Sequence, residues 1–106
     1  MHFSVDKKTA GRIRESGCFI RHGAVSLRYL PHDSYRYSPV VSKRQGGAVE
    51  RNRVKRVIRD IMQKGAGRYP DGAYLIFFNG GCSSLNREIL TSDLDMLMSM
   101  IYGYIE

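Results

Sequence analysis

The sequence predicts an α+β sandwich in which helices cover a single sheet. Segments with the two-residue period of a strand lie before and after a long segment with a helical period, and a second long helical segment ends the chain. The expected order is a weak helix, two or three strands, a helix, a strand and a helix. A length of 106 residues fits one domain that spans residues 1–106.

The first elements are short. A helix is expected over residues 6–16, where Gly11 weakens it. Residues 24–30 (AVSLRYL) alternate apolar and polar side chains, which is typical of a half-buried strand. Residues 35–42 (YRYSPVVS) form a second candidate strand, and Pro39 within it favours an edge position or a bulge.

The remaining elements are longer or more apolar. Residues 73–78 (AYLIFF) form a continuous apolar run, which suits a strand buried on both faces. Residues 47–64 and 86–104 are expected to be helices. In the last helix the apolar residues recur at steps of three and four; they are Leu90, Leu94, Leu97, Ile101 and Tyr104.

Charge is distributed unevenly along the chain. Residues 1–64 carry fifteen Lys or Arg and five Asp or Glu, whereas residues 65–106 carry two and five, so +10 and −3 give the net charge of +7. A polarised basic protein of this size most often binds a polyanion.

Composition also excludes several classes of protein. No apolar run approaches the roughly 18 residues of a membrane span, and the N-terminus has no apolar stretch before a small-residue cleavage site, so we expect a cytoplasmic protein. No lipidation motif is visible and the basic helix lacks the bulky aromatic and leucine face of interfacial helices, so we expect no membrane partner. Cys18 and Cys82 have no partner at ligand spacing, which argues against a disulfide framework and against a zinc site. A chain this small does not easily enclose a small-molecule cofactor, and none is expected.

Residues 49–62 combine an apolar face with a cationic face. On a wheel with about 100° per residue, one face spans roughly 200° from Arg51. We call it the cationic face; its members are Arg51, Asn52, Arg53, Lys55, Arg56 and Arg59. The opposite face is apolar, with Val54, Val57, Ile58 and Ile61.

The cationic face is unfavourable for an isolated helix. Arg51, Lys55 and Arg59 follow one another at four-residue spacing, where like charges cost a few tenths of a kcal/mol each. A row of phosphates would neutralise them, and arginine binds phosphate through a planar fork of donors. Asn52 can donate to or accept from a phosphate, a 2′-hydroxyl or a base edge. This face therefore predicts nucleic-acid binding.

The segment before this helix contains Lys43, Arg44, Gly46 and Gly47. Two glycines at the start of a helix let the backbone approach a phosphate closely. Glycines between a strand and a helix are more often simple turn geometry, and the cationic helix beside them strengthens the phosphate-binding interpretation. The sequence leaves both interpretations open.

Residues 41–60 (VSKRQGGAVERNRVKRVIRD) resemble the signature of the bacterial ribonuclease P protein subunit. That signature has a V-S-K-K stretch, a G-x-A-V step and an R-N-R-x-K-R-x-x-R-[ED] helix. The resemblance implies a four-stranded sheet with the element order α-β-β-β-α-β-α. It also implies a left-handed βαβ connection around the basic helix, whereas the general rule predicts a right-handed one.

The resemblance also implies a function. The protein would join a catalytic RNA, ribonuclease P RNA, and the two would remove 5′ leaders from precursor tRNA. The RNA is expected to carry out hydrolysis with Mg²⁺ that it mainly binds itself, so no catalytic residue and no metal ligand is expected in the protein. Eight residues are expected to bind RNA: Lys43, Arg44, Arg51, Asn52, Arg53, Lys55, Arg56 and Arg59.

The leader-binding residues of the family are less well matched. Members usually carry two phenylalanines on the first helix and a tyrosine on the next strand, and these side chains line a cleft for the leader. The best placement puts Ala10 and Arg14 at the phenylalanine positions. The cleft is then expected to contain four other residues: Phe19, Val25, Arg28 and Tyr29.

Two other functions fit a basic helix. The chain could be an RNA- or ribosome-binding module with no link to catalysis, or a DNA-binding regulator that places residues 51–59 in a major groove. Five cations with a single amide favour phosphate contacts over base recognition, which argues against the regulator. The signature favours the ribonuclease P subunit over the general RNA-binding module.

Overall fold

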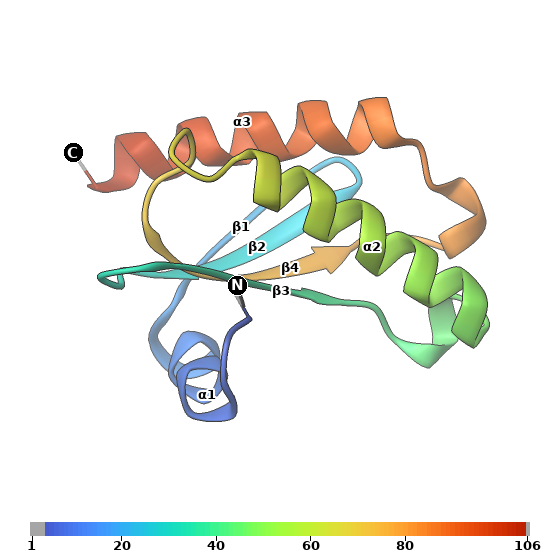
Figure 1. Ribbon diagram of the computed structural model, residues 1–106, viewed down its shortest axis with the longest axis horizontal. Coiled ribbons are helices and arrows are strands. Elements are labelled where there is room, and N and C mark those ends of the chain that lie inside the picture. Colours follow the sequence, from blue (N-terminus) through green and yellow to red (C-terminus); the bar gives the residue numbers. More distant parts are fainter. Residues whose placement is uncertain (1–3, 106) are drawn as a thin grey trace.

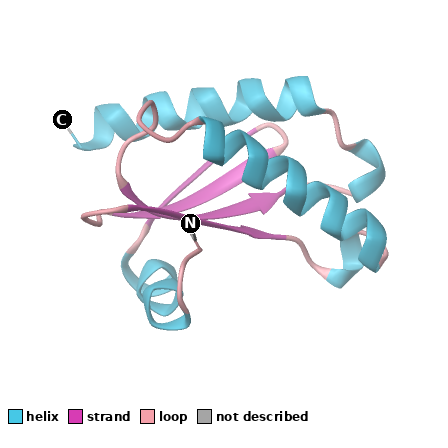
Figure 2. Cartoon of the chain, in the orientation of Figure 1, coloured by secondary structure: helices cyan, strands magenta, loops and turns pink. Residues whose placement is uncertain are grey.

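The computed structural model describes residues 4–105 and contains a four-stranded mixed sheet with helices packed on it (Figures 1 and 2). The elements follow in the order α1 (Lys7–Ser16), β1 (Cys18–His22), β2 (Val25–Leu30), β3 (Tyr35–Val40), η1 (Lys43–Gln45), α2 (Ala48–Lys64), β4 (Gly72–Phe78), η2 (Cys82–Ser84) and α3 (Arg87–Ile105). The predicted α+β class and the order α-β-β-β-α-β-α are confirmed.

One strand is not located by the sequence pattern. β1 begins with three consecutive apolar residues, Cys18, Phe19 and Ile20, which hide the two-residue period. Phe19 is 52% exposed, although a large apolar side chain in a strand is usually expected to be buried. The strand is recognised from its pairing with β2, in which Ile20 lies opposite Leu27.

The strand order is β1-β2-β4-β3, and it explains two sequence features. β4 lies between β2 and β3, so both its faces and both its edges are covered, as its apolar run predicts. β3 lies at an edge, where Pro39 is tolerated because the strand does not need every N–H for pairing.

β3 and β4 are parallel and are joined through α2. In Figure 1, β3 is the nearer strand, β4 lies behind it and α2 lies above both, so the connection is left-handed, as the family resemblance implies. This connection places α2 over the β3 side of the sheet, beside α3.

The sheet has a hydrophobic core on each face. The larger core lies under α2 and α3 and includes Leu27, Ile76 and Leu94, all fully buried. The smaller core lies under α1, where Ile13 packs with Leu75. α1 therefore adds partial cover on the face opposite α2 and α3 (Figure 1).

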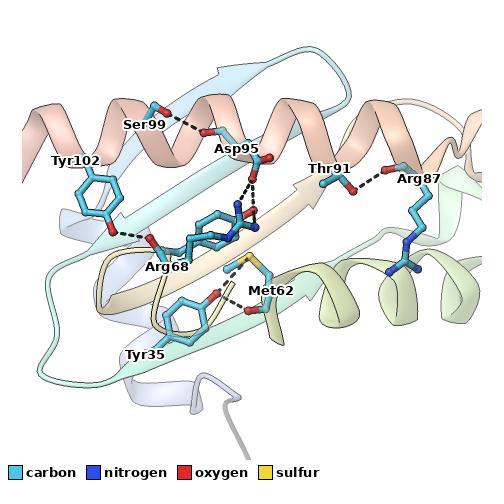
Figure 3. Close-up of polar contacts among 9 residues, drawn as sticks. Tyr35, Met62, Arg68, Arg87, Thr91, Asp95, Ser99 and Tyr102 are labelled. Carbon is cyan, nitrogen blue, oxygen red and sulfur yellow. Dashed lines mark hydrogen bonds and ion pairs between the residues drawn. The ribbon is translucent and has the colours of Figure 1, made fainter. Parts of the chain in front are cut away.

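Tyrosines occupy much of the larger core. The ring centroids of Tyr29 and Tyr74 are 5.1 Å apart, and those of Tyr35 and Tyr74 are 5.9 Å apart. The Tyr35 hydroxyl donates to the carbonyl oxygen of Met62 at 2.6 Å and thereby links β3 to α2 (Figure 3). Buried tyrosine rings fill the space between α2 and the sheet, and the hydrogen bond from Tyr35 to Met62 fixes the distance between them.

The loop between α2 and β4 is attached to α3. The Tyr102 hydroxyl donates to the carbonyl oxygen of Arg68 at 2.5 Å, and the Arg68 guanidinium lies 3.5 Å from the Asp95 carboxylate (Figure 3). The Tyr69 hydroxyl also donates to Asp95.

Among the described helices, none is both long and apolar enough to cross a membrane.

Burial raises the pKa of the Tyr35, Tyr69 and Tyr74 hydroxyls well above the ordinary value. Because these pKa values are higher in the folded chain than in the unfolded one, their stabilising effect is complete below about pH 10 and is lost as the pH rises further.

We therefore expect the free energy of unfolding to fall steeply above pH 10, by roughly 1.4 kcal/mol for each buried tyrosine at pH 11. Denaturant unfolding measured from pH 8 to 11 checks this. The Tyr35→Phe variant, which has one hydroxyl fewer, should lose stability less steeply. Equal pH dependence in both proteins would contradict the prediction.

Candidate nucleic-acid interface

α2 separates into the two faces that the sequence predicts. Val54 and Ile58 are fully buried, Ile61 is 4% exposed, and Val57 is half-buried against the same core. Met62 completes the apolar face and is also buried. This face packs on β3 and η2, so the opposite side of the helix is directed away from the protein.

The cationic face lies on that outward side. Asn52, Arg53, Arg56 and Arg59 are exposed. Arg51 and Lys55 are half-buried, and the Nε atom of Arg51 donates to the carbonyl oxygen of Gly46 at 3.1 Å. This hydrogen bond connects the start of the helix to the preceding loop.

Among the described residues, no carboxylate neutralises the cations of this face. Within residues 4–105, no carboxylate forms an ion pair with any of its five Lys or Arg side chains. The nearby Glu50 carboxylate instead accepts from the backbone N–H of Gly47 at 3.1 Å, which caps the helix. The other nearby acid, Asp60, binds Lys64 and Arg87. The face is therefore available to an external row of anions.

The loop before α2 is held against the sheet. The Gln45 side-chain amide donates to the carbonyl oxygens of Phe78 and Gly80 at 2.6 and 2.7 Å, and its own oxygen accepts from the Ser42 N–H at 2.8 Å. Lys43 and Arg44 are exposed on η1, immediately before the cationic helix. The anchored loop holds these two cations at a fixed position next to α2.

Gly46 has a packing role. A Cβ atom there would lie 3.0 Å from the Cβ of Cys82, on the short helix η2. This close approach favours the interpretation of the glycine pair as turn and packing geometry. Gly47 is exposed, and among the described residues a Cβ atom there would meet only the Glu50 carboxylate, at 3.5 Å.

A shallow hollow lies on the cationic face. Its volume is about 420 Å³, and it is lined by Asn52, Arg56, Arg59, Asp60 and Gln63. Two guanidinium groups and two amides offer donors to phosphate or sugar oxygens there. Gln63 is missing from the sequence prediction, although it lies at about 120° on the same wheel and could have been found by extending it by one turn.

Two of the four residues expected in a leader cleft are buried. Val25 is fully buried and Tyr29 is 2% exposed, because both side chains point into the core under α2 and α3. Neither can line an open cleft, and that part of the prediction is wrong. The alternation of β2 identifies which residues share a face but not which face the longer helices cover.

Phe19 and Arg28 lie on the other face of the sheet, on the side of α1. They are paired across β1 and β2, and the Arg28 guanidinium lies 5.0 Å from the centroid of the Phe19 ring. On α1, Ala10 packs against the smaller core and Arg14 is exposed. An exposed aromatic ring with a cation over it can stack on an unpaired base.

Comparison with known proteins identifies the family. Residues 6–102 match the family model described as Ribonuclease P. The ribonuclease P protein component of Coprothermobacter proteolyticus is 32% identical over 91 residues, which are 86% of this chain and 76% of that protein.

Solved structures share the fold. The Staphylococcus aureus RNase P protein at 2.0 Å gives a TM-score of 0.83 at 17% identity, with 95% of this chain and 96% of that chain covered. The RNase P protein from Thermotoga maritima gives 0.79 at 18% identity, with 90% and 94% covered. The family match spans both the cationic helix and the sheet that supports it, and the chain belongs to the ribonuclease P protein family.

Proposed function

We propose that this chain is the protein subunit of ribonuclease P, which binds the catalytic RNA and precursor tRNA and promotes endonucleolytic removal of the 5′ leader. The observation that carries the proposal is the cationic face of α2, which the chain's own carboxylates leave unpaired among the described residues. Family membership supports the same conclusion, because the curated relative is named a ribonuclease P protein component.

The RNA contacts are assigned to α2 and the loop before it. Arg53, Arg56 and Arg59 are exposed and available for phosphate oxygens, and Lys43 and Arg44 extend the same charge onto η1. Arg51, Lys55 and Asn52 complete the set. These groups would screen repulsion between closely packed phosphates and so favour Mg²⁺ binding by the RNA.

Catalysis is assigned to the RNA. The family resemblance implies that the RNA performs the hydrolysis, and on that ground we assign the chain's own residues no metal-binding role. The Mg²⁺ that hydrolysis requires would be held mainly by RNA phosphates.

We place the complex in the cytoplasm.

The leader is assigned to the opposite face of the sheet. Phe19 and Arg28 remain from the predicted cleft, and the exposed ring of Phe19 offers a stacking surface beside a cation. They would replace the aromatic side chains that the family usually carries on its first helix.

Reconstitution tests the proposal as a whole. The protein alone should leave precursor tRNA uncleaved, whereas adding it to a bacterial ribonuclease P RNA at low Mg²⁺ should restore correct 5′ ends. The RNA alone at the same Mg²⁺ concentration is the control. If the folded protein binds RNA but does not stimulate cleavage, the chain is an RNA-binding module of another kind.

Removing cations from α2 should weaken RNA binding without unfolding the protein. We expect Arg53→Ala or Arg56→Ala to lower the affinity for ribonuclease P RNA several-fold and to reduce the slope of log affinity against log salt by about one. Their melting temperatures should fall by no more than a few degrees, because both side chains are exposed.

Arg12→Ala is the matched control for these variants. Arg12 is also exposed, but it lies on α1, on the other side of the sheet. This change removes the same charge and should leave the affinity for ribonuclease P RNA within about twofold of wild type. An equal loss in all three variants would show that only net charge matters.

Phe19→Ala should weaken the binding of precursor tRNA to the reconstituted complex but not the binding of mature tRNA. Loss of one stacked base is worth roughly 1–3 kcal/mol, or about five- to 150-fold in affinity. Ile89→Ala is the control, since Ile89 is similarly exposed (54%) but lies on α3. Equal effects on both tRNAs would remove Phe19 from the leader site.

A further inference from the structure

The hollow on α2 contains one group that phosphate binding does not explain. Asp60 lines it together with Arg56 and Arg59, and it is the single acidic residue between positions 51 and 64. A carboxylate so close to bound phosphates would repel them. If the hollow bound phosphate by charge alone, the Asp60 carboxylate would therefore weaken that binding beside Arg56 and Arg59.

Asp60 is held in place by two cations. Its Oδ2 atom lies 3.2 Å from the Nζ of Lys64 and accepts from an Nη2 hydrogen of Arg87. Arg87 extends from the first turn of α3 towards α2, and its carbonyl oxygen accepts from the Thr91 hydroxyl at 2.7 Å (Figure 3). Both cations engage the same oxygen, so the orientation of the carboxylate is fixed from one side.

The second oxygen, Oδ1, remains available. Across residues 4–105 it has no hydrogen bond or ion pair, and the Asp60 side chain is 39% exposed. Because Lys64 and Arg87 offset the charge at Oδ2, a phosphate bound at Arg56 and Arg59 is repelled less than it would be by a free carboxylate. In a residue that lines the hollow, Oδ1 is therefore a hydrogen-bond acceptor that the two ion pairs at Oδ2 hold in place.

We propose that Asp60 is a specificity-determining residue that accepts a hydrogen bond from a nucleotide bound in this hollow. Arg56 and Arg59 bind the phosphate, and Oδ1 of Asp60 selects a donor on the same nucleotide. The hollow, at about 420 Å³, falls in the range of small-ligand sites, roughly 300–1,000 Å³. The inference rests on the proposed RNA-binding function and adds selectivity to it.

The donor is either a ribose 2′-hydroxyl or a base amino group. Both are neutral donors that a carboxylate accepts from well, and the 2′-hydroxyl distinguishes RNA from DNA. A phosphate oxygen has no hydrogen to donate to Asp60. The residue therefore favours nucleotides over simple polyanions.

Asp60→Asn is the decisive variant. Lys64 and Arg87 would hold the amide oxygen where Oδ2 lies, so the amide NH₂ takes the place of Oδ1 and an acceptor becomes a donor. We expect roughly tenfold weaker binding of bacterial ribonuclease P RNA, the loss typical of one charge-assisted hydrogen bond. The salt dependence should not change, because no phosphate contact is removed.

Asp33→Asn is the matched control. The Asp33 side chain is 97% exposed in the turn before β3, far from α2 in the sequence, and the change removes the same negative charge. It should bind the RNA as tightly as wild type or slightly more tightly. If Asp60→Asn behaves in the same way, Asp60 is only a repulsive surface charge and the proposal is wrong.

Two further readouts separate the explanations. A loss of affinity with a shallower salt dependence would mean that Asp60 acts only by positioning Lys64 and Arg87, which also overturns the proposal. If wild type does not bind the RNA, or Arg56→Ala binds as well as wild type, the proposed function fails instead. Heparin, a polyanion without nucleotides, should bind Asp60→Asn at least as tightly as wild type.

Oligocytidylate and its deoxy form identify the donor. When wild type and Asp60→Asn are compared, a loss with both oligonucleotides assigns the base amino group. A loss with the ribose form alone assigns the 2′-hydroxyl. Equal affinities of the two proteins for both oligonucleotides would overturn the proposal.

Discussion

Burial of one side of α2 is the constraint on which the site depends. Ile58 and Met62 are inserted between the helix and the sheet, and the Tyr35 hydroxyl fixes the end of the helix through the Met62 carbonyl oxygen. Rotating the helix to hide its arginines would expose this apolar face, at a cost of about 1.5–3 kcal/mol for each large side chain. The core therefore determines where the charge points.

The rest of the helix compensates for crowding of like charge. Glu50 caps its first turn, and Asp60 binds Lys64 and Arg87 near its end, so neither carboxylate neutralises a cation of the cationic face. Helix stability is supported at the ends, while the middle stays unpaired in the described chain. Packing against the sheet supplies the stability that this helix would lack in isolation.

Local patterns in the sequence predict most of the secondary structure of this protein. They do not predict contacts between residues that are far apart in the sequence. The wheel of α2 correctly separates Val54 and Ile58 from the arginines, and the apolar run of β4 correctly predicts a central strand. The same kind of reasoning misplaces Tyr29, because alternation does not say which face α1 covers. Contact between Asp60 and Arg87, 27 residues apart, depends on the angle between two helices and has no local signal.

The left-handed crossover also separates two surfaces. The cationic face of α2 and the Phe19–Arg28 pair lie on opposite sides of a sheet whose four strands are joined by hydrogen bonds in the order β1-β2-β4-β3. A molecule bound to the outer side of α2 and another bound at Phe19 and Arg28 would be separated by the sheet together with the helix that packs on it. The sheet and α2 would then set a fixed distance between the two binding surfaces.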